Sequence, residues 1–267
     1  MDDATNGNGR MTDAEKTLPV AACGGFHFFS PNTEEFARIC EDVFAGHEYG
    51  FQTRKRHPYI IDAGAHVGVA THYFKQQYPE ARVLALEANP ATCALLRRNV
   101  SHNGLGDIRV LHAALAPQAG EIAFYTGAEE DASGSWGDSA VRQPWHEEHA
   151  TAIRRVPAVT LSSLLTEPVD MLKLDIEGLE TAVLAEAAPY LHRVRRIALE
   201  FHGTRANPEN DVIRLAATLE AAGFTVDIRQ FGASIAIPAI QRDDPFWLMI
   251  HATRPGPLAR LRAAVGH

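Results

Sequence analysis

The chain has 267 residues, of which 46% are hydrophobic, enough for one large domain whose core needs no disulfide or metal. Its formal net charge of -8 disfavours binding to nucleic acid or to an anionic membrane surface, because both favour a basic protein surface. Three widely spaced cysteines, Cys23, Cys40 and Cys93, indicate neither a disulfide framework nor a zinc site, so we expect a reducing compartment. The sequence shows no apolar run of membrane-spanning length and no signal-peptide pattern, which favours a cytoplasmic location.

Composition divides the chain into four parts. Residues 1–18 are polar and are expected to form a flexible N-terminal arm. Residues 19–56 are expected to form a helical lid, with a helix that starts near Asn32 and runs to Phe44. Strand and helix patterns alternate over residues 57–254, which are expected to form the main domain, and residues 255–267 are expected to form a short basic tail.

The alternating region predicts a Rossmann-like α/β fold with a seven-stranded, mostly parallel sheet and helices on both faces. Strands are expected at 59–62, 82–87, 108–112, 170–175, 196–202, 224–231 and 246–252, and extra strands at 121–126 and 156–161. Helices are expected from Val69 to Pro79, after Asn89, from Gly178 to Ala188 and after Asn207. Because no helix separates the last two strands, one of them should be antiparallel, at the edge of the sheet.

The first strand ends in a glycine turn that predicts the ligand. Asp62, Gly64 and Gly68 form D-x-G-x-x-x-G, not the G-x-G-x-x-G of a dinucleotide site. A carboxylate at this strand end suits a ligand with an ammonium and a sulfonium, which favours S-adenosylmethionine. His66, within the turn, is either a neutral surface imidazole or a contact to the cofactor carboxylate. Ala65 belongs to the same turn and to the expected cofactor site.

Glu87 ends the second strand, 19 residues after Gly68 (87 − 68). An acid there accepts hydrogen bonds from two ribose hydroxyls, as in dinucleotide folds. We include the adjacent Ala88 and Asn89 in the cofactor site, although Asn89 also caps the next helix. Ala114 follows the third strand, where an adenine ring would need a small apolar neighbour, but core packing explains it equally well.

The candidate catalytic residues lie at the ends of two later strands. Asp175 ends one strand, and Glu200 and His202 share a face of the next, which makes them candidates to remove a proton from a hydroxyl. Together with Glu177 they could instead bind Mg²⁺ or Mn²⁺. We expect no metal, because Glu177 and Glu180 should lie in the first turn of a helix, where the helix dipole already explains acids.

Several of these segments resemble the FkbM-type S-adenosylmethionine-dependent methyltransferases. The resemblance rests on five segments between residues 49 and 231: Ile61–Gly68, Leu86–Pro90, Asn99–Leu105, Leu172–Glu180 and Leu199–His202. It implies a class I methyltransferase fold and O-methylation of sugars, glycolipids or polyketide-type natural products. Leu161-Ser-Ser163 stands where the family commonly has Leu-Asp, so a role for that aspartate does not carry over.

The leading functional hypothesis is therefore an S-adenosylmethionine-dependent O-methyltransferase that acts on a small hydroxylated molecule. The alternatives are metal-assisted methyl transfer at Asp175, Glu200 and His202, a non-catalytic module that binds S-adenosylmethionine, and a nicotinamide dehydrogenase, which the glycine pattern disfavours. Residues 127–150 are expected to form a loop in which Trp136 and Trp145 either stack on the substrate or seal the loop onto the domain. The oligomeric state is not readable from the sequence.

Overall fold

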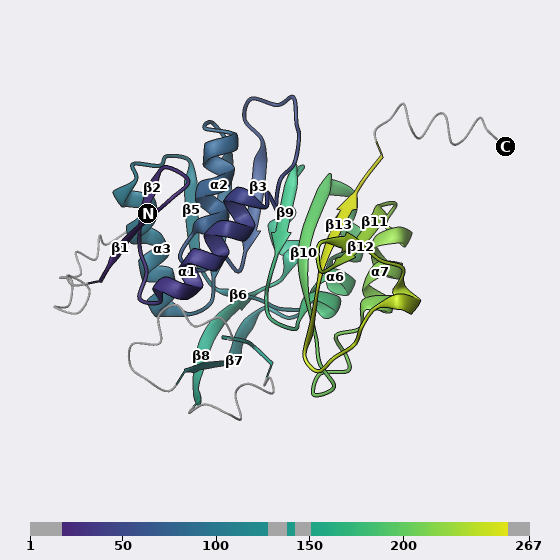
Figure 1. The fold of residues 1–267 in the computed structure, drawn as a ribbon. Helices are drawn as coiled ribbons and strands as arrows, with labels where there is room; N and C mark the ends of the chain where they lie inside the picture. Colours follow the sequence, from purple (N-terminus) through teal and green to yellow (C-terminus); the bar gives the residue numbers. More distant parts are fainter. Residues whose placement is uncertain (1–17, 128–137, 142–150, 256–267) are drawn as a thin grey trace, which may run out of the picture.

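A computed structural model describes residues 18–127, 138–141 and 151–255, and an eight-stranded sheet forms its centre (Figure 1). From edge to edge the strands are β12 (Ala233–Ser234), β11 (Thr225–Gln230), β13 (Phe246–Thr253), β10 (Arg196–Gly203), β9 (Met171–Leu174), β3 (Tyr59–Ala63), β4 (Arg82–Glu87) and β5 (Ile108–His112). Neighbours from β10 to β5 are parallel, as the alternation of strands and helices predicts.

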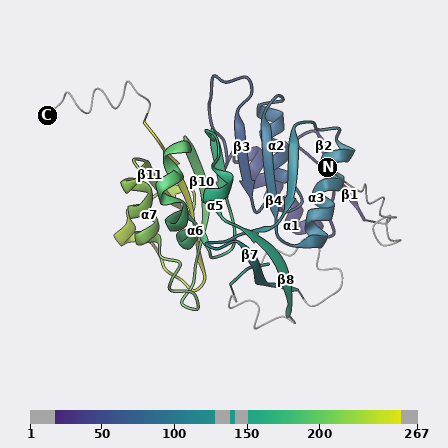
Figure 2. The ribbon, with the colours of Figure 1, turned by 180° about the vertical axis from the view of Figure 1, so that it is seen from behind.

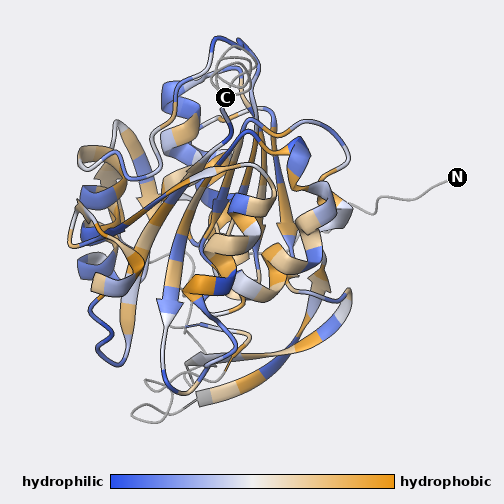
Figure 3. Ribbon diagram, turned by 90° about the vertical axis from the view of Figure 1, so that its right-hand side faces the viewer, coloured by the Kyte–Doolittle hydropathy of each residue, from blue (hydrophilic) through white to orange (hydrophobic). Residues whose placement is uncertain are grey.

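Helices cover both faces of this sheet (Figures 1 and 2). The helices α1 (Thr33–Cys40), α2 (Val69–Gln77) and α3 (Pro90–His102) pack on one face, and α5 (Leu161–Leu164), α6 (Glu180–Ala187) and α7 (Val212–Ala221) on the other. Short helical turns are η1 (Glu41–Ala45), η2 (Ala188–Arg193) and η3 (Ile237–Ala239). Apolar residues are concentrated along the central strands (Figure 3), which agrees with a sheet buried on both faces. None of the described helices combines the length and apolar character that a membrane span requires.

The position of the antiparallel strand differs from our expectation. β13 is antiparallel to both neighbours, as the missing helix predicts, but it lies between β10 and β11 and not at an edge. The backbone of β13 explains the difference, because it forms hydrogen-bonded ladders with β10 and with β11, while Leu248, Ile250 and Ala252 on its covered face are at most 1% exposed. The two-residue strand β12 forms the edge instead, so the sheet has eight strands and not the seven that we expected.

The segment before the sheet contains a hairpin that the sequence analysis missed. β1 (Val20–Cys23) and β2 (Phe26–Phe29) pair antiparallel, and Asn99 of α3 and Asn103, the C-cap residue of α3, bind the other edge of β2. The Asn99 amide exchanges hydrogen bonds with the backbone of Phe29 at 2.7 and 3.2 Å, and Asn103 does the same with His27 at 3.0 and 2.7 Å. Residues four apart on a helix match residues two apart on a strand, so the asparagines replace a missing neighbouring strand.

A disulfide between Cys23 of the hairpin and Cys40 of α1 contradicts our interpretation of the cysteines. The fold brings these residues together across 17 positions, with 6.0 Å between their Cα atoms, which spacing in the sequence could not reveal. The expectation of a reducing compartment loses its basis with this finding. Cys93 remains a buried free thiol.

Three further differences concern element boundaries. The extra strands form a separate sheet of β6 (Ala114–Leu115), β8 (Thr151–Val159) and β7 (Gly120–Gly127), which extends from the main sheet (Figure 1). α7 is capped by Asp211 and not by Asn207, whose amide donates to the carbonyl of Gly178. α6 begins at Glu180, so Glu177 lies outside it.

Candidate active site

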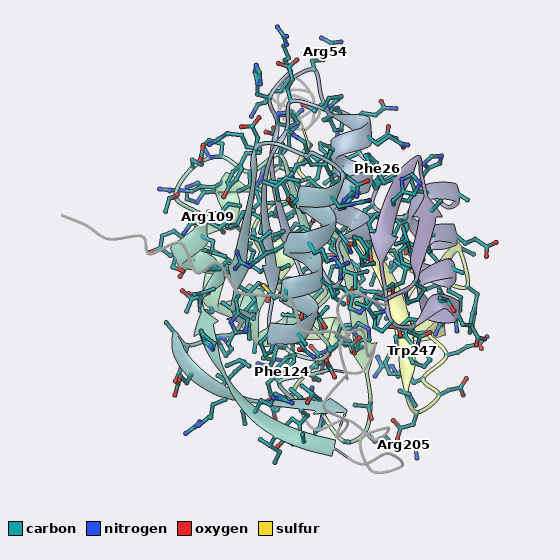
Figure 4. All side chains as sticks on the ribbon, turned by 90° about the vertical axis from the view of Figure 1, so that its left-hand side faces the viewer. Phe26, Arg54, Arg109, Phe124, Arg205 and Trp247 are labelled. Atoms are coloured by element: carbon teal, nitrogen blue, oxygen red, sulfur yellow. A yellow bond between two sulfur atoms is a disulfide. The ribbon has the colours of Figure 1, made fainter. Side chains whose placement is uncertain are left out.

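A cavity lies at the carboxyl ends of the parallel strands, where open α/β sheets bind their ligands. Figure 4 shows this polarity, because Arg54, which precedes β3, and Arg205, which follows β10, lie at opposite ends of the molecule. Eight of the predicted site residues line the cavity: Gly64, Ala65, His66, Glu87, Ala88, Ala114, Asp175 and Glu200. Four do not: Asp62, Gly68, Asn89 and His202.

The turn after β3 forms one wall of the cavity. The Gly64 and Ala65 N–H groups donate to the carbonyl of Leu86 at 3.0 and 2.8 Å, which ties the turn to β4. Gly64 has φ +75°, and a Cβ at this position would overlap the carbonyl oxygen of Asp175. Only glycine therefore allows the turns after β3 and β9 to approach this closely.

Glu87 reaches the cavity from the end of β4. Its carboxylate accepts hydrogen bonds from the N–H groups of His66 and Asn89, both at 2.8 Å. Burial nevertheless raises the pKa of Glu87 to about 7, because the side chain is shielded from water. Small residues, among them Ala88, Ala114 and the neighbouring Ala113, line the same part of the cavity.

Three of the predicted cofactor residues have structural roles instead. Asp62 is fully buried, accepts a hydrogen bond from Thr71 at 2.6 Å and lies 3.6 Å from the ammonium of Lys173, so it cannot meet a ligand in the cavity. Gly68 is the N-cap residue of α2, with φ +99°. The Asn89 side chain accepts hydrogen bonds from N–H groups in the first turn of α3 and so caps this helix, the other role that we expected for it.

The N-terminal segment contributes acids that the sequence analysis missed: Glu35, Asp42 and Glu48 line the cavity. Glu35 is 6% exposed, and its Oε1 accepts no hydrogen bond from the described residues. Burial and the nearby Asp138 raise the pKa of Glu35 to about 8. The sequence offered one signal for Glu35, an acid on the apolar face of an amphipathic helix. The helix dipole explains an acid in the first turn of α1 equally well.

Lys173 and Asp175 form a fixed pair on β9 and the loop after it. The Lys173 side chain is 4% exposed, and its ammonium donates to the carbonyl of Gly64 at 2.5 Å and to Asp175 at 3.1 Å. Burial opposes protonation of Lys173, but Asp175 and Asp62 outweigh it and raise its pKa. Burial likewise opposes ionisation of Asp175, yet Lys173 and His202 lower its pKa.

His202 is buried behind the cavity and faces four carboxylates. Its Nδ1 lies 3.4 Å from Glu180, and its Nε2 lies 3.5 Å from Glu177, 3.7 Å from Glu200 and 4.0 Å from Asp175. Burial lowers the pKa of His202, but these acids outweigh it and raise the pKa well above the usual value. His202 does not line the cavity, whereas Asp175 and Glu200 do, and its role as the base stays a prediction.

The two other acids of this group differ in position. Glu177 has φ +57° and lies before α6, so the helix dipole does not explain it as we expected. Glu200 lines the cavity from β10, and burial together with repulsion from Asp175 raises its pKa to about 8. Within the described residues, one ligand atom each of Asp175, Glu200 and His202 lie within 4.8 Å of one another, close enough to hold a metal ion.

A second cavity of about 740 Å³ meets the first at three shared acids, Asp42, Glu48 and Glu200. It runs over the exposed face of β10 and β13, where Trp247 is 53% exposed (Figure 4). Trp247 therefore offers the aromatic surface that we expected from Trp136 and Trp145, both of which lie outside the described residues.

Comparisons with known proteins show the family of this chain. Residues 62–226 match the family model of the methyltransferase FkbM domain. A methyltransferase, sdnD, of Sordaria araneosa is 28% identical over 219 residues, 70% of this chain and 82% of its own. The 2-O-methyltransferase NoeI of Sinorhizobium fredii is 26% identical over 160 residues, 55% of this chain and 64% of its own, so the match leaves about a third of NoeI uncovered.

Among solved structures, the methyltransferase FkbM of Methylobacillus flagellatus superposes with a TM-score of 0.48 at 14% identity. That match covers 76% of this chain and only 45% of the other. The family match extends over more than half of the present chain and includes every strand-end acid described above. This protein is a methyltransferase, and it belongs to the FkbM family.

Proposed function

We propose that this methyltransferase uses S-adenosylmethionine and methylates a hydroxyl oxygen of a small molecule. The observation that carries the proposal is the junction of the two cavities, where Glu200 borders both and Asp175 lies beside it. With the methyl donor in the first cavity and the acceptor in the second, the acceptor hydroxyl would meet the methyl group next to two carboxylates.

The residues of the first cavity fit S-adenosylmethionine. Glu87 presents a buried carboxylate for the ribose hydroxyls, and the alanines around Ala114 leave room for a flat adenine ring. Glu35 and Asp42 present carboxyl groups to the ammonium and the sulfonium, the role that we expected for Asp62, and a bound cation would favour the ionised form of Glu35. Oε1 of Glu35 accepts no hydrogen bond from the described residues and lies 3.8 Å from Nε2 of His66, so it can accept a hydrogen bond from a ligand, which supports this assignment.

When bound, S-adenosylmethionine supplies a methyl group on a positively charged sulfur, which is already an electrophile. The protein has to align an acceptor hydroxyl with that group, and alignment can contribute about 7–11 kcal/mol. The hydroxyl oxygen bonds to the methyl carbon as the carbon–sulfur bond breaks, and its proton passes to Asp175 or Glu200. Proton removal of this kind contributes about 10²–10⁴-fold to the rate. Lys173 fixes Asp175, and His202 positions the carboxylates around it.

The acceptor class follows from the relatives and from charge. One relative is named a 2-O-methyltransferase, which supports a hydroxyl acceptor such as a sugar, a glycolipid or a polyketide-type product. The net charge of -8 argues against a nucleic acid. Aromatic surface at Trp247 suits stacking on a sugar or another ring.

Calorimetry with S-adenosylmethionine, S-adenosylhomocysteine and NAD tests the donor, and a methyl-transfer screen over hydroxylated sugars and macrolide-like compounds, read by mass, tests the acceptor. We expect both sulfur compounds to bind and NAD not to bind. Asp175→Asn should lower turnover about 10²–10⁴-fold and leave S-adenosylhomocysteine affinity within a few-fold, whereas Glu220→Gln on the exposed face of α7 should change neither. Binding of NAD without either sulfur compound would refute the proposal.

A further inference from the structure

Three carboxylates converge on one nitrogen of a buried histidine. Oxygen atoms of Glu177, Glu200 and Asp175 lie 3.5, 3.7 and 4.0 Å from Nε2 of His202. The His202 side chain is 4% exposed, and its Nε2 makes no hydrogen bond to any residue that the structure describes. These distances are within ion-pair range but longer than typical hydrogen bonds, so the carboxylate oxygens surround the nitrogen.

The other nitrogen of the ring is held in place. Nδ1 of His202 forms a hydrogen bond with the fully buried Glu180, and Glu180 in turn accepts from the Gly178 N–H at 2.9 Å and from Asn210 at 2.5 Å. Asn210 also donates to the carbonyl of His202 at 3.0 Å. Histidine ligands of metals are oriented in this way, because a carboxylate that accepts a hydrogen bond from Nδ1–H keeps the proton on Nδ1 and leaves the Nε2 lone pair for the metal.

Within the described residues, more acids than cations meet at His202. Asp175, Glu180 and Glu200 face one imidazole, and the only other cation described in contact with them, Lys173, is shared with Asp62. Buried carboxylates that lack a proton or a counter-ion are strongly unfavourable.

We propose that Asp175, Glu200 and His202 bind one divalent cation of the Mg²⁺ and Mn²⁺ class. Their ligand atoms lie within 4.8 Å of one another, so a point about 2.8 Å or less from all three exists, and small side-chain movements would bring them to the bond lengths of such ions. Two carboxylates and an imidazole suit Mn²⁺ and Mg²⁺, and Glu177 is placed to supply a further oxygen.

The role of the cation rests on the proposed function. Three protein ligands leave positions open on an octahedral ion, and Glu200 lies where the two cavities meet. The acceptor hydroxyl can therefore bind the ion there, which lowers the pKa of the hydroxyl and makes its proton easier to transfer to solvent or to a carboxylate. The cation thus supplements the base assistance described above.

The test is titration of the EDTA-dialysed full-length protein with Mn²⁺, followed by electron paramagnetic resonance of the free ion. We expect one Mn²⁺ per chain, at least tenfold weaker binding in Asp175→Asn and Glu200→Gln, and coupling to an imidazole nitrogen that His202→Gln abolishes. Glu180→Gln should weaken binding about 10–100-fold through the histidine. The exposed Glu220→Gln is the matched control and should bind as the unmodified chain does.

Absence of Mn²⁺ binding at millimolar concentration, or binding without nitrogen coupling, would overturn the cation site. The coupling is measured on the unmodified chain, so the result stands even if a variant fails to fold. S-adenosylhomocysteine calorimetry on the same samples separates the two proposals. Cofactor binding without Mn²⁺ overturns only the cation site, whereas Mn²⁺ binding without cofactor supports the site and overturns the proposed donor.

Discussion

Replacing Glu87 by glutamine tests the cofactor assignment most directly. The substitution keeps the shape of the side chain but removes the charge and one of two acceptor oxygens. Hydrogen bonds to charged groups contribute about 1.5–3 kcal/mol each, and Glu87 is only 8% exposed, so water can replace little of the loss. The affinity for S-adenosylmethionine should therefore fall about 10- to 150-fold, measured by isothermal titration calorimetry.

The pH dependence of the same equilibrium gives a second measurement. Burial raises the pKa of Glu87 to about 7, and a protonated carboxyl accepts hydrogen bonds from the ribose less well. Affinity should be full above pH 7 and should fall as the pH drops below it, by up to about tenfold per unit. The Glu87→Gln variant has no such group and should lose this part of the pH dependence.

Stability has to be separated from binding in this experiment, because Glu87 also accepts the N–H groups of His66 and Asn89. Urea unfolding of Glu87→Gln and of the control Glu220→Gln supplies that correction. The reasoning would be refuted if Glu87→Gln, folded at the temperature of the assay, bound S-adenosylmethionine within about threefold of the unmodified chain.

The remaining predictions concern the framework of the site. Gly64→Ala should abolish cofactor binding and should lower the free energy of unfolding by several kcal/mol more than Gly104→Ala does. Gly104 also has a positive φ but has open space around it, so only about 1–2 kcal/mol is expected there. Equal midpoints of urea unfolding for the two variants would contradict the close approach of Gly64 to Asp175. Reduction of the Cys23–Cys40 disulfide should lower the free energy of unfolding by about 3 kcal/mol, and titration of the denatured, unreduced chain should find one thiol instead of three. Asn99→Ala removes the hydrogen bonds to the partly buried backbone of Phe29 and to the carbonyl of Val67, so it should lower the free energy of unfolding in urea by about 2–4 kcal/mol.

Local signals allowed much of the fold to be predicted. Apolar strands, the turn at Gly64 and the asparagine–proline start of α3 are properties of neighbouring residues, and the structure confirms them. The strand-end acids Glu87 and Asp175 were also identifiable, because parallel strands bring their carboxyl ends to one edge of the sheet. The family followed from the same short segments.

Other features depend on contacts between distant residues, which no local pattern contains. The site of β13 within the sheet, the pairing of Cys23 with Cys40 and the burial of Asp62 against Lys173 each join segments far apart in the chain. The surroundings of His202 are decided in the same way, since its neighbouring carboxylates come from β10 and from the residues around the start of α6. The sequence by itself determined which strands end in acids, whereas only the tertiary structure decided which acids face the cavity and which are buried against other side chains and fix their positions.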